Sequence, residues 1–144
     1  MITTIIATIV ALGVLVTVHE FGHYWVAKRC DVRVLRFSVG FGRALFSWKD
    51  KSGTEFCVAA IPLGGYVKML DGREQQLSAA ERSKAFDQKT VGQRFAIVAA
   101  GPGINFIFAA IVYALISMVG VEKAIPVVGE LPSQTAVKTQ LPAE

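Results

Sequence analysis

The sequence predicts an α-helical polytopic membrane protein in which two transmembrane helices flank a re-entrant β-hairpin or sheet. Residues 1–18 carry no charged side chain, and neither do residues 95–121. Between these apolar runs lies a segment rich in glycine, β-branched and aromatic residues, which is typical of strands and turns. The 144-residue chain is 53% hydrophobic, and its mean hydropathy of +0.48 favours a membrane protein over a water-soluble domain.

The first predicted membrane helix runs from about residue 2 to residue 27. With a rise of ~1.5 Å per residue, it is long enough to cross a hydrocarbon core of about 30 Å. A cleaved signal peptide is the alternative interpretation. No basic residue precedes the apolar run, and no small-residue cleavage site is evident before Lys28. We therefore expect a helix that spans the membrane.

His19, Glu20 and His23 lie near the end of this run and form the pattern H-E-x-x-H. Residues four apart lie on nearly the same face of a helix, so both imidazoles can reach one metal ion. A zinc ion bound in this way lowers the pKa of a bound water to about 7, and a neighbouring carboxylate can take its proton. We predict His19 and His23 as zinc ligands and Glu20 as the general base.

The alternative is an accidental match of a short pattern at a helix end. The chain contains two histidines, and both belong to the pattern. Glu20 follows a long uncharged run and so lies in or beside the bilayer, where an ionised side chain costs on the order of 2.5–3.5 kcal/mol or more. Because a bound cation would offset this cost, we favour a metal site.

The segment 28–94 is strongly basic, with thirteen of the fifteen Lys and Arg residues and a net charge of +6. A basic segment can bind nucleic acid, but between two apolar runs the positive-inside rule explains it, so we expect no nucleic-acid partner. We expect this segment to be cytoplasmic or re-entrant and both chain ends to be periplasmic. Cys30 and Cys57 form no C-x-x-C pattern and are interpreted as reduced thiols, with metal binding as the alternative.

The region 32–70 is predicted to contain four short strands separated by glycine-containing breaks. The strands are 34–39, 44–48, 54–60 and 66–70, and the breaks are 40–42, 49–53 and 62–65. Residues 56–63 are too apolar for a cytosolic sheet, whereas non-helical backbone at membrane depth must be covered by protein or line a wet cavity. A re-entrant sheet beside the first helix meets both constraints. A small soluble sheet and a linker are the alternatives.

The polar residues 71–94 predict a loop or surface helix, to which we assign no chemistry. The uncharged residues 95–121 predict the second membrane helix. Within it, the segment 101–103 (Gly-Pro-Gly) predicts a kinked face for close helix packing. The Asn105 amide is costly if unpaired in lipid. It belongs to this packing face or forms a hydrogen bond with a catalytic partner or a substrate backbone.

Four segments of the chain, in family order, resemble the site-2 protease family of intramembrane zinc metalloproteases. They are V-H-E-F-G-H at 18–23, F-S-V-G-F-G at 37–42, I-P-L-G-G-Y-V-K-M at 61–69 and A-G-P-G-I-N-F at 100–106. The resemblance implies zinc bound by His19 and His23, Glu20 as the general base, and a membrane-re-entrant sheet.

The resemblance also implies substrate-binding positions and a class of substrates. The substrate-binding positions would be Asn105 in the second helix and Gly40, Phe41, Gly42 and Tyr66 in the sheet. The implied substrates are transmembrane segments, notably of an anti-sigma factor, and remnant signal peptides. The implied surroundings are the lipid bilayer of the bacterial inner membrane.

The chain departs from this family at the third zinc ligand. Members supply an aspartate from a later membrane helix, in an N-x-x-P-x-x-x-x-D-G pattern that follows one or two periplasmic PDZ domains. Asp71-Gly72 lacks the preceding asparagine and proline. We therefore interpret residues 1–121 as the membrane core of a larger enzyme with its third ligand downstream, and residues 122–144 as the incomplete start of a PDZ-like domain.

The expected activity is cleavage of peptide bonds within the bilayer by the complete enzyme. Two imidazoles leave the usual set of three protein ligands one short, so this segment alone is expected to be inactive. A catalytically inactive membrane scaffold is one alternative function. A two-helix transport or assembly subunit with an accidental motif is the other.

Overall fold

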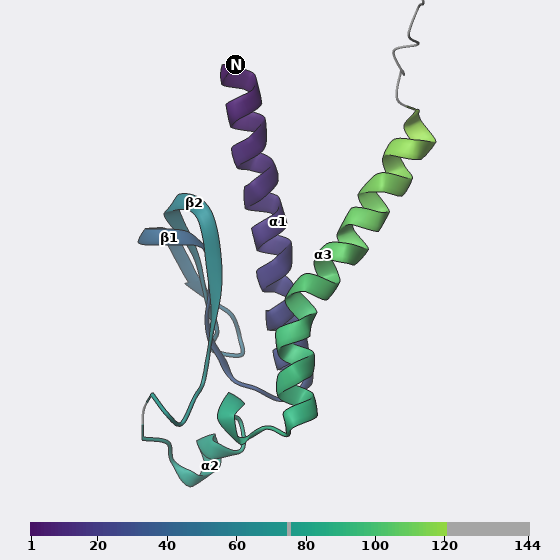
Figure 1. Ribbon diagram of the computed structural model, residues 1–144. Helices are drawn as coiled ribbons and strands as arrows, with labels where there is room; N and C mark the ends of the chain where they lie inside the picture. Colours follow the sequence, from purple (N-terminus) through teal and green to yellow (C-terminus); the bar gives the residue numbers. More distant parts are fainter. Residues whose placement is uncertain (75, 121–144) are drawn as a thin grey trace, which may run out of the picture.

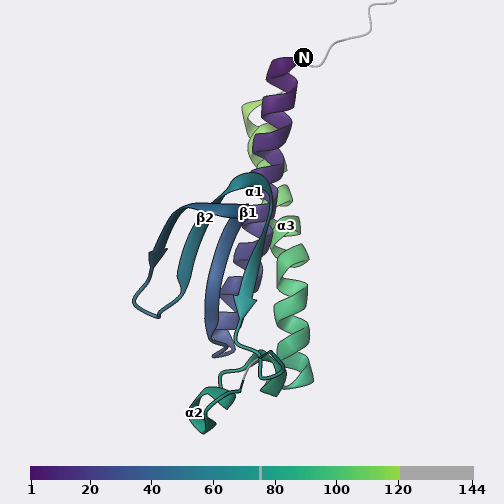
Figure 2. The ribbon, with the colours of Figure 1, turned by 90° about the vertical axis from the view of Figure 1, so that its left-hand side faces the viewer.

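The computed structural model describes residues 1–74 and 76–120 (Figure 1). The elements, in chain order, are helix α1 (Ile2–Arg29), strands β1 (Val34–Lys49) and β2 (Glu55–Met69), helix α2 (Ala79–Arg82), the 3-10 helix η1 (Phe86–Gln88) and helix α3 (Val91–Val119). The sheet lies along one side of α1, and α3 lies along another (Figures 1 and 2). The PDZ-like start predicted for residues 122–144 falls outside the described residues.

Helices α1 and α3 are both long and apolar enough to cross a membrane. Helix α1 covers the predicted range and continues to Lys28 and Arg29, whose positive charges interact favourably with the C-terminal end of the helix dipole. The two helices lie side by side over one half of α1 and diverge toward its N-terminus (Figure 1).

Helix α3 begins at Val91, four residues before the predicted start at residue 95. The Thr90 hydroxyl accepts a hydrogen bond from the backbone N–H of Gln93, and the Gln93 side chain accepts one from the backbone N–H of Thr90. This capping box starts the helix within the polar segment, so Arg94 lies inside the helix. The helix continues through Pro102, and its axis changes direction partway along, as a missing backbone donor allows (Figure 1).

The four predicted strands are halves of two long, bent strands. Strand β1 contains the predicted strands 34–39 and 44–48 and bends between them, where Gly40 and Gly42 have φ values of 90° and 87°. This backbone region is open to glycine and costly for other residues. Strand β2 bends within residues 61–65, where Gly64 has a φ value of 132°. The predicted breaks at 40–42 and 62–65 lie within β1 and β2, and the chain reverses its direction at each of them as well as in the turn after Lys49 (Figure 2).

The bends divide the sheet into four arms. Strands β1 and β2 form an antiparallel hairpin, in which arm 44–49 pairs with arm 55–59 and arm 34–39 pairs with arm 65–69. Arm 34–39 also faces residues 55–58 on its other side, for example Ser38 opposite both Tyr66 and Cys57. The order across the sheet is thus 44–49, 55–59, 34–39, 65–69 (Figure 2). The free edges are the first and last arms.

The bent end of the sheet reaches the middle of α1. A Cβ atom placed on Gly13 would lie 3.9 Å from the carbonyl oxygen of Pro62, while the base of the sheet packs in a core with Ala27 and Ile97. The sheet therefore follows α1 for roughly 20 Å, at 1.5 Å per residue. Large apolar side chains are exposed at its bent end, namely Phe41, Leu45, Phe46, Ile61 and Leu63. The bent end of the sheet therefore exposes an apolar surface.

A loop or surface helix was expected for the polar segment 71–94, and its described part before α3 contains turns, the short helix α2 and the 3-10 helix η1 against the base of the sheet. The backbone N–H of Phe86 donates to the carbonyl of Leu70, and that of Arg33 donates to the carbonyl of Lys84. Leu70 and Ala85 are fully buried there. The segment therefore closes the polar end of the structure and joins the sheet to α3.

Candidate metal centre

His19 and His23 lie one helical turn apart on α1 and face α3. Their Nε2 atoms are 3.2 Å apart, and their ring centroids are 4.8 Å apart. Two nitrogens bound to one zinc ion at about 2.0–2.1 Å with tetrahedral angles would be about 3.3 Å apart. The two imidazoles therefore have the separation that a shared zinc ion requires.

His23 is fixed by a hydrogen bond to α3. Its Nδ1 atom lies 2.7 Å from the carbonyl oxygen of Ile97. Because a carbonyl oxygen only accepts, Nδ1 carries a proton and donates, and the Nε2 atom of the neutral ring keeps its lone pair for a metal. Histidine ligands of metal ions commonly have such a carbonyl partner, which sets both the tautomer and the ring orientation.

The space beside the two Nε2 atoms exists because residue 101 is glycine. A Cβ atom on Gly101 would lie 2.4 Å from Nε2 of His23 and 2.7 Å from Nε2 of His19. Gly22 on α1 is equally restricted, since its Cβ atom would lie 2.5 Å from the carbonyl oxygen of Ala100. These two glycines bring the helix backbones together and leave room between the imidazoles. The donor set and this space fit a zinc ion.

Glu20 and His19 line a pocket of about 350 Å³ between α1, α3 and the bent end of the sheet. Its other lining residues are Leu15, Val16, Phe41, Gly64, Gly65 and Asn105. A Cβ atom on Gly65 would lie 3.1 Å from Cγ of Glu20, so the last arm of the sheet approaches the predicted base directly. The pocket brings the predicted residues Glu20, His19, Asn105 and Phe41 together.

Gly40, Gly42 and Tyr66 do not line this pocket but position a residue that does. Gly40 and Gly42 form the bend that carries Phe41, and a Cβ atom on Gly40 would lie 2.7 Å from the carbonyl oxygen of Ile61. The ring of Tyr66 stacks on that of Phe41, with centroids 6.4 Å apart. Their predicted role in substrate binding would therefore be indirect.

Gly64 and Gly65 were not predicted as site residues. A Cβ atom on Gly64 would lie 2.0 Å from the ring of Phe41, so glycine is needed there to seat that ring beside the pocket. The sequence signal was the Gly-Gly pair, which the pattern identified only as a break between strands. Its proximity to Glu20 arises from packing of the sheet against α1.

A third metal ligand is absent from the part of the chain that the structure describes. Within residues 1–74 and 76–120, no three His, Cys, Asp or Glu side chains gather as metal ligands would. The Asp71 carboxylate accepts a hydrogen bond of 2.9 Å from Nε of Arg73, and this bond holds the pKa of Asp71 below its usual value. The Asp71 carboxylate is thus paired with Arg73. A third zinc ligand downstream of this chain is still a prediction.

Comparison with known proteins adds independent evidence on the family. The sequence profile of peptidase family M50 matches residues 7–142. "Regulator of sigma-E protease RseP" from Salmonella typhimurium is 57% identical over 136 residues, which cover 94% of this chain and 30% of the relative. The protein of that name from Escherichia coli is 60% identical over 127 residues, covering 88% of this chain and 28% of the relative.

A third relative, from Vibrio cholerae, is classed by its name as a zinc metalloprotease. It is 52% identical over 126 residues, which cover 88% of this chain and 28% of the relative. The chain spans less than a third of the length of each of these relatives. Because the family profile matches almost the whole sequence, including the two histidines and Glu20, the chain belongs to peptidase family M50.

Proposed function

We propose that this chain is the zinc-binding part of a metalloprotease that cleaves peptide bonds within a lipid bilayer. The observation that carries the proposal is the pair of Nε2 atoms 3.2 Å apart, next to Glu20, in a helix of membrane-spanning length. The names of the relatives, which include protease and zinc metalloprotease, support it. A catalytically inactive scaffold that retains the motif is the alternative that the experiment below tests.

Each residue of the motif has a separate role in this proposal. His19 and His23 hold the metal through Nε2. When bound, zinc supplies Lewis acidity that polarises a peptide carbonyl and lowers the pKa of a water molecule. Glu20 accepts the proton of that water and passes it to the leaving amine. The pocket that Glu20 shares with Gly64 and Gly65 is where the reacting peptide bond would lie.

The edge of arm 65–69 is the proposed binding site for the substrate backbone. A helical substrate hides its carbonyls in its own hydrogen bonds, so it must become extended before it can be cut. An extended segment can add to a free sheet edge through backbone hydrogen bonds. Arm 34–39 is paired on both sides and cannot accept it, whereas arm 65–69 has a free edge and its Gly65 approaches Glu20.

The proposed substrates are transmembrane segments of other proteins. The resemblance to the site-2 protease family implies an anti-sigma factor and remnant signal peptides, and two relatives are named as regulators of sigma-E. The open pocket between α1, α3 and the sheet is compatible with a segment that enters sideways from lipid. The sequence of any one substrate is not part of the proposal.

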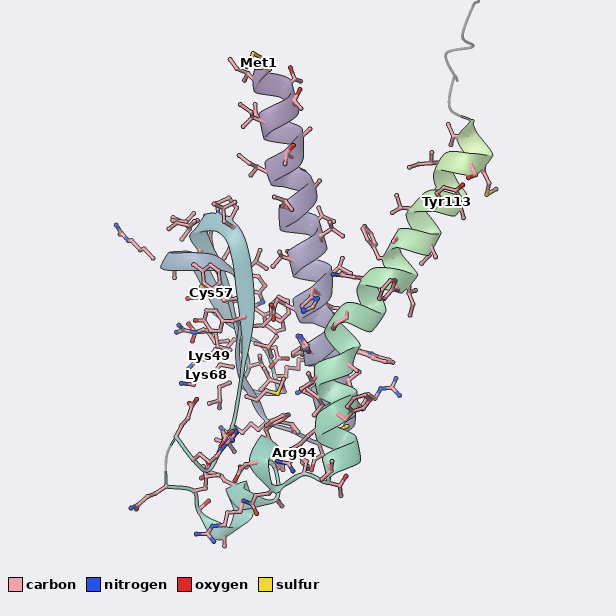
Figure 3. All side chains as sticks on the ribbon, viewed as in Figure 1. Met1, Lys49, Cys57, Lys68, Arg94 and Tyr113 are labelled. Atoms are coloured by element: carbon pink, nitrogen blue, oxygen red, sulfur yellow. The ribbon has the colours of Figure 1, made fainter. Side chains whose placement is uncertain are left out.

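The proposed location is the bacterial inner membrane, with both ends of the segment 1–121 periplasmic. Figure 3 places Met1 and Arg94 toward opposite ends of the structure, with Lys49 and Lys68 nearer the end of Arg94. The positive-inside rule assigns the basic end to the cytoplasm. The apolar bent end of the sheet would then lie within the bilayer, covered on one side by α1.

Replacing Glu20 tests the proposed chemistry. In the full-length enzyme, Glu20→Gln should lower cleavage of a membrane-embedded reporter by at least about 100-fold, because it removes the general base. Zinc content should stay near one ion per chain, because Glu20 does not bind the metal. His19→Ala and His23→Ala should lose the zinc as well as the activity. Cleavage by Glu20→Gln at a rate near wild type would exclude Glu20 as the base.

Proline substitutions test the proposed edge. At those positions of 65–68 whose N–H points away from arm 34–39, proline removes a donor that only a substrate would use. Such variants should lose most cleavage while zinc content and thermal stability remain unchanged. On the other free edge, proline at whichever of Leu45 and Phe46 has its N–H pointing away from arm 55–59 provides the matched control and should leave cleavage intact. Equal effects at both edges would argue against strand addition at arm 65–69.

The two cysteines test the proposed topology. Cys30 is partly exposed at the end of α1, and Cys57 is buried in the sheet. A membrane-impermeant thiol reagent should label Cys30 only after the cytoplasmic side is opened, and Cys57 should react only after unfolding. Cys30→Ser and Cys57→Ser assign each signal. Labelling of either thiol from outside intact spheroplasts would reverse the orientation.

A further inference from the structure

The two imidazoles form part of a continuous series of polar contacts that starts and ends on α3. Nδ2 of Asn105 lies 3.3 Å from Nδ1 of His19, and Nε2 of His19 lies 3.2 Å from Nε2 of His23. Nδ1 of His23 lies 2.7 Å from the carbonyl oxygen of Ile97. Asn105 and Ile97 lie two helical turns apart on α3, with Gly101 between them.

The carbonyl at one end determines the proton positions along the series. The Ile97 oxygen only accepts, so His23 is protonated on Nδ1 and its Nε2 accepts. His19 must then donate from Nε2 and accept at Nδ1, and the NH₂ group of Asn105 is the donor that Nδ1 needs. With these tautomers, each of the three contacts joins one donor to one acceptor. In this tautomer, however, Nε2 of His19 carries a proton and has no lone pair for a metal.

Binding of a metal through Nε2 requires the other tautomer of His19, with its proton on Nδ1. That proton would face the NH₂ group of Asn105. Both groups are donors, so they could not form a hydrogen bond. Rotation of the amide by about half a turn exchanges Nδ2 for Oδ1 and provides an acceptor. Oδ1 is buried and has no hydrogen-bond partner within the described residues, so the rotation breaks no existing bond of that oxygen.

We propose that Asn105 is a positioning residue for His19, whose amide rotates as the tautomer of His19 changes. It donates to Nδ1 when Nε2 of His19 is protonated, and it accepts from Nδ1–H when Nε2 binds zinc. This inference rests on the proposed zinc site and adds a residue that controls it. An amide can serve both tautomers because it carries a donor and an acceptor, which a lysine or a carboxylate does not.

A contact of Asn105 with substrate would be a different role, and the two roles predict different measurements. A substrate contact affects cleavage and leaves zinc affinity unchanged. A positioning role changes zinc affinity itself, because partners of metal-bound histidines typically account for 10–100-fold in affinity. Zinc affinity is therefore the measurement that separates them.

The experiment measures zinc dissociation constants of the purified full-length enzyme by competition with a chromophoric chelator. Asn105→Leu removes both donor and acceptor and should weaken zinc binding by about 10–100-fold. Asn105→Asp supplies a carboxylate that accepts from Nδ1–H and should bind zinc within about threefold of wild type or more tightly. Phe106→Leu is the matched control, since the Phe106 side chain is 78% exposed, and should not change the affinity.

The outcomes distinguish this inference from the proposed function. If His19→Ala loses zinc while Asn105→Leu binds it as wild type does, the positioning role is wrong and the zinc site stands. If Asn105→Asp binds as weakly as Asn105→Leu, an acceptor at Nδ1 is not what matters, and the inference also fails. Absence of zinc from the wild-type enzyme would overturn the proposed function itself. Should Asn105→Leu not fold, Asn105→Ala against Asn105→Asp gives the same comparison.

Discussion

The close approach of α1 and α3 is the constraint on which the rest of this structure depends. Gly22 lets the backbone of α3 approach α1, and Gly101 does the same beside the imidazoles. This contact brings the carbonyl of Ile97 to His23 and the amide of Asn105 to His19. Without α3, the imidazoles of His19 and His23 would have no partners to hold them. Without α1, the amide of Asn105 would lack its contact with His19. Together they fix two imidazoles at the separation that one metal ion needs.

A second constraint concerns the sheet, whose backbone lies beside a helix of membrane-spanning length and needs hydrogen-bond partners there. Its four arms satisfy most backbone groups among themselves, because both strands bend and pair a second time. Exposed backbone is then confined to two edges. One of these edges ends at Gly64 and Gly65 in the pocket of Glu20. Flexible glycines thus allow both the bends and the contact with the candidate catalytic residue.

Periodicity and composition were sufficient to predict much of the fold from the sequence. The uncharged runs predicted both long helices, and the spacing of His19 and His23 predicted that they share a face of α1. The strand runs were also located correctly. The chain also reverses at the predicted breaks 40–42 and 62–65. The order of the arms across the sheet depends on contacts made far along the chain, so it was not predictable locally.

The other differences concern the start of α3 and two residues of the site. The start of α3 was placed at a charge boundary, although the Thr90–Gln93 capping box determines it. Gly101 was interpreted only as a packing residue, because its contact with both imidazoles joins positions about eighty residues apart. For Asn105 the sequence left packing, catalytic and substrate contacts open. The structure places its amide 3.3 Å from Nδ1 of His19, which favours a role in the metal centre.

X-ray absorption at the zinc edge of the full-length enzyme tests the central claim most directly. The account predicts a first shell of nitrogen and oxygen at about 2.0–2.1 Å, with the outer-shell scattering of two imidazole rings. Loss of either histidine should remove one ring from the spectrum. A sulfur shell near 2.3 Å, or the absence of imidazole scattering, would show that zinc binds elsewhere and would contradict the assignment of His19 and His23.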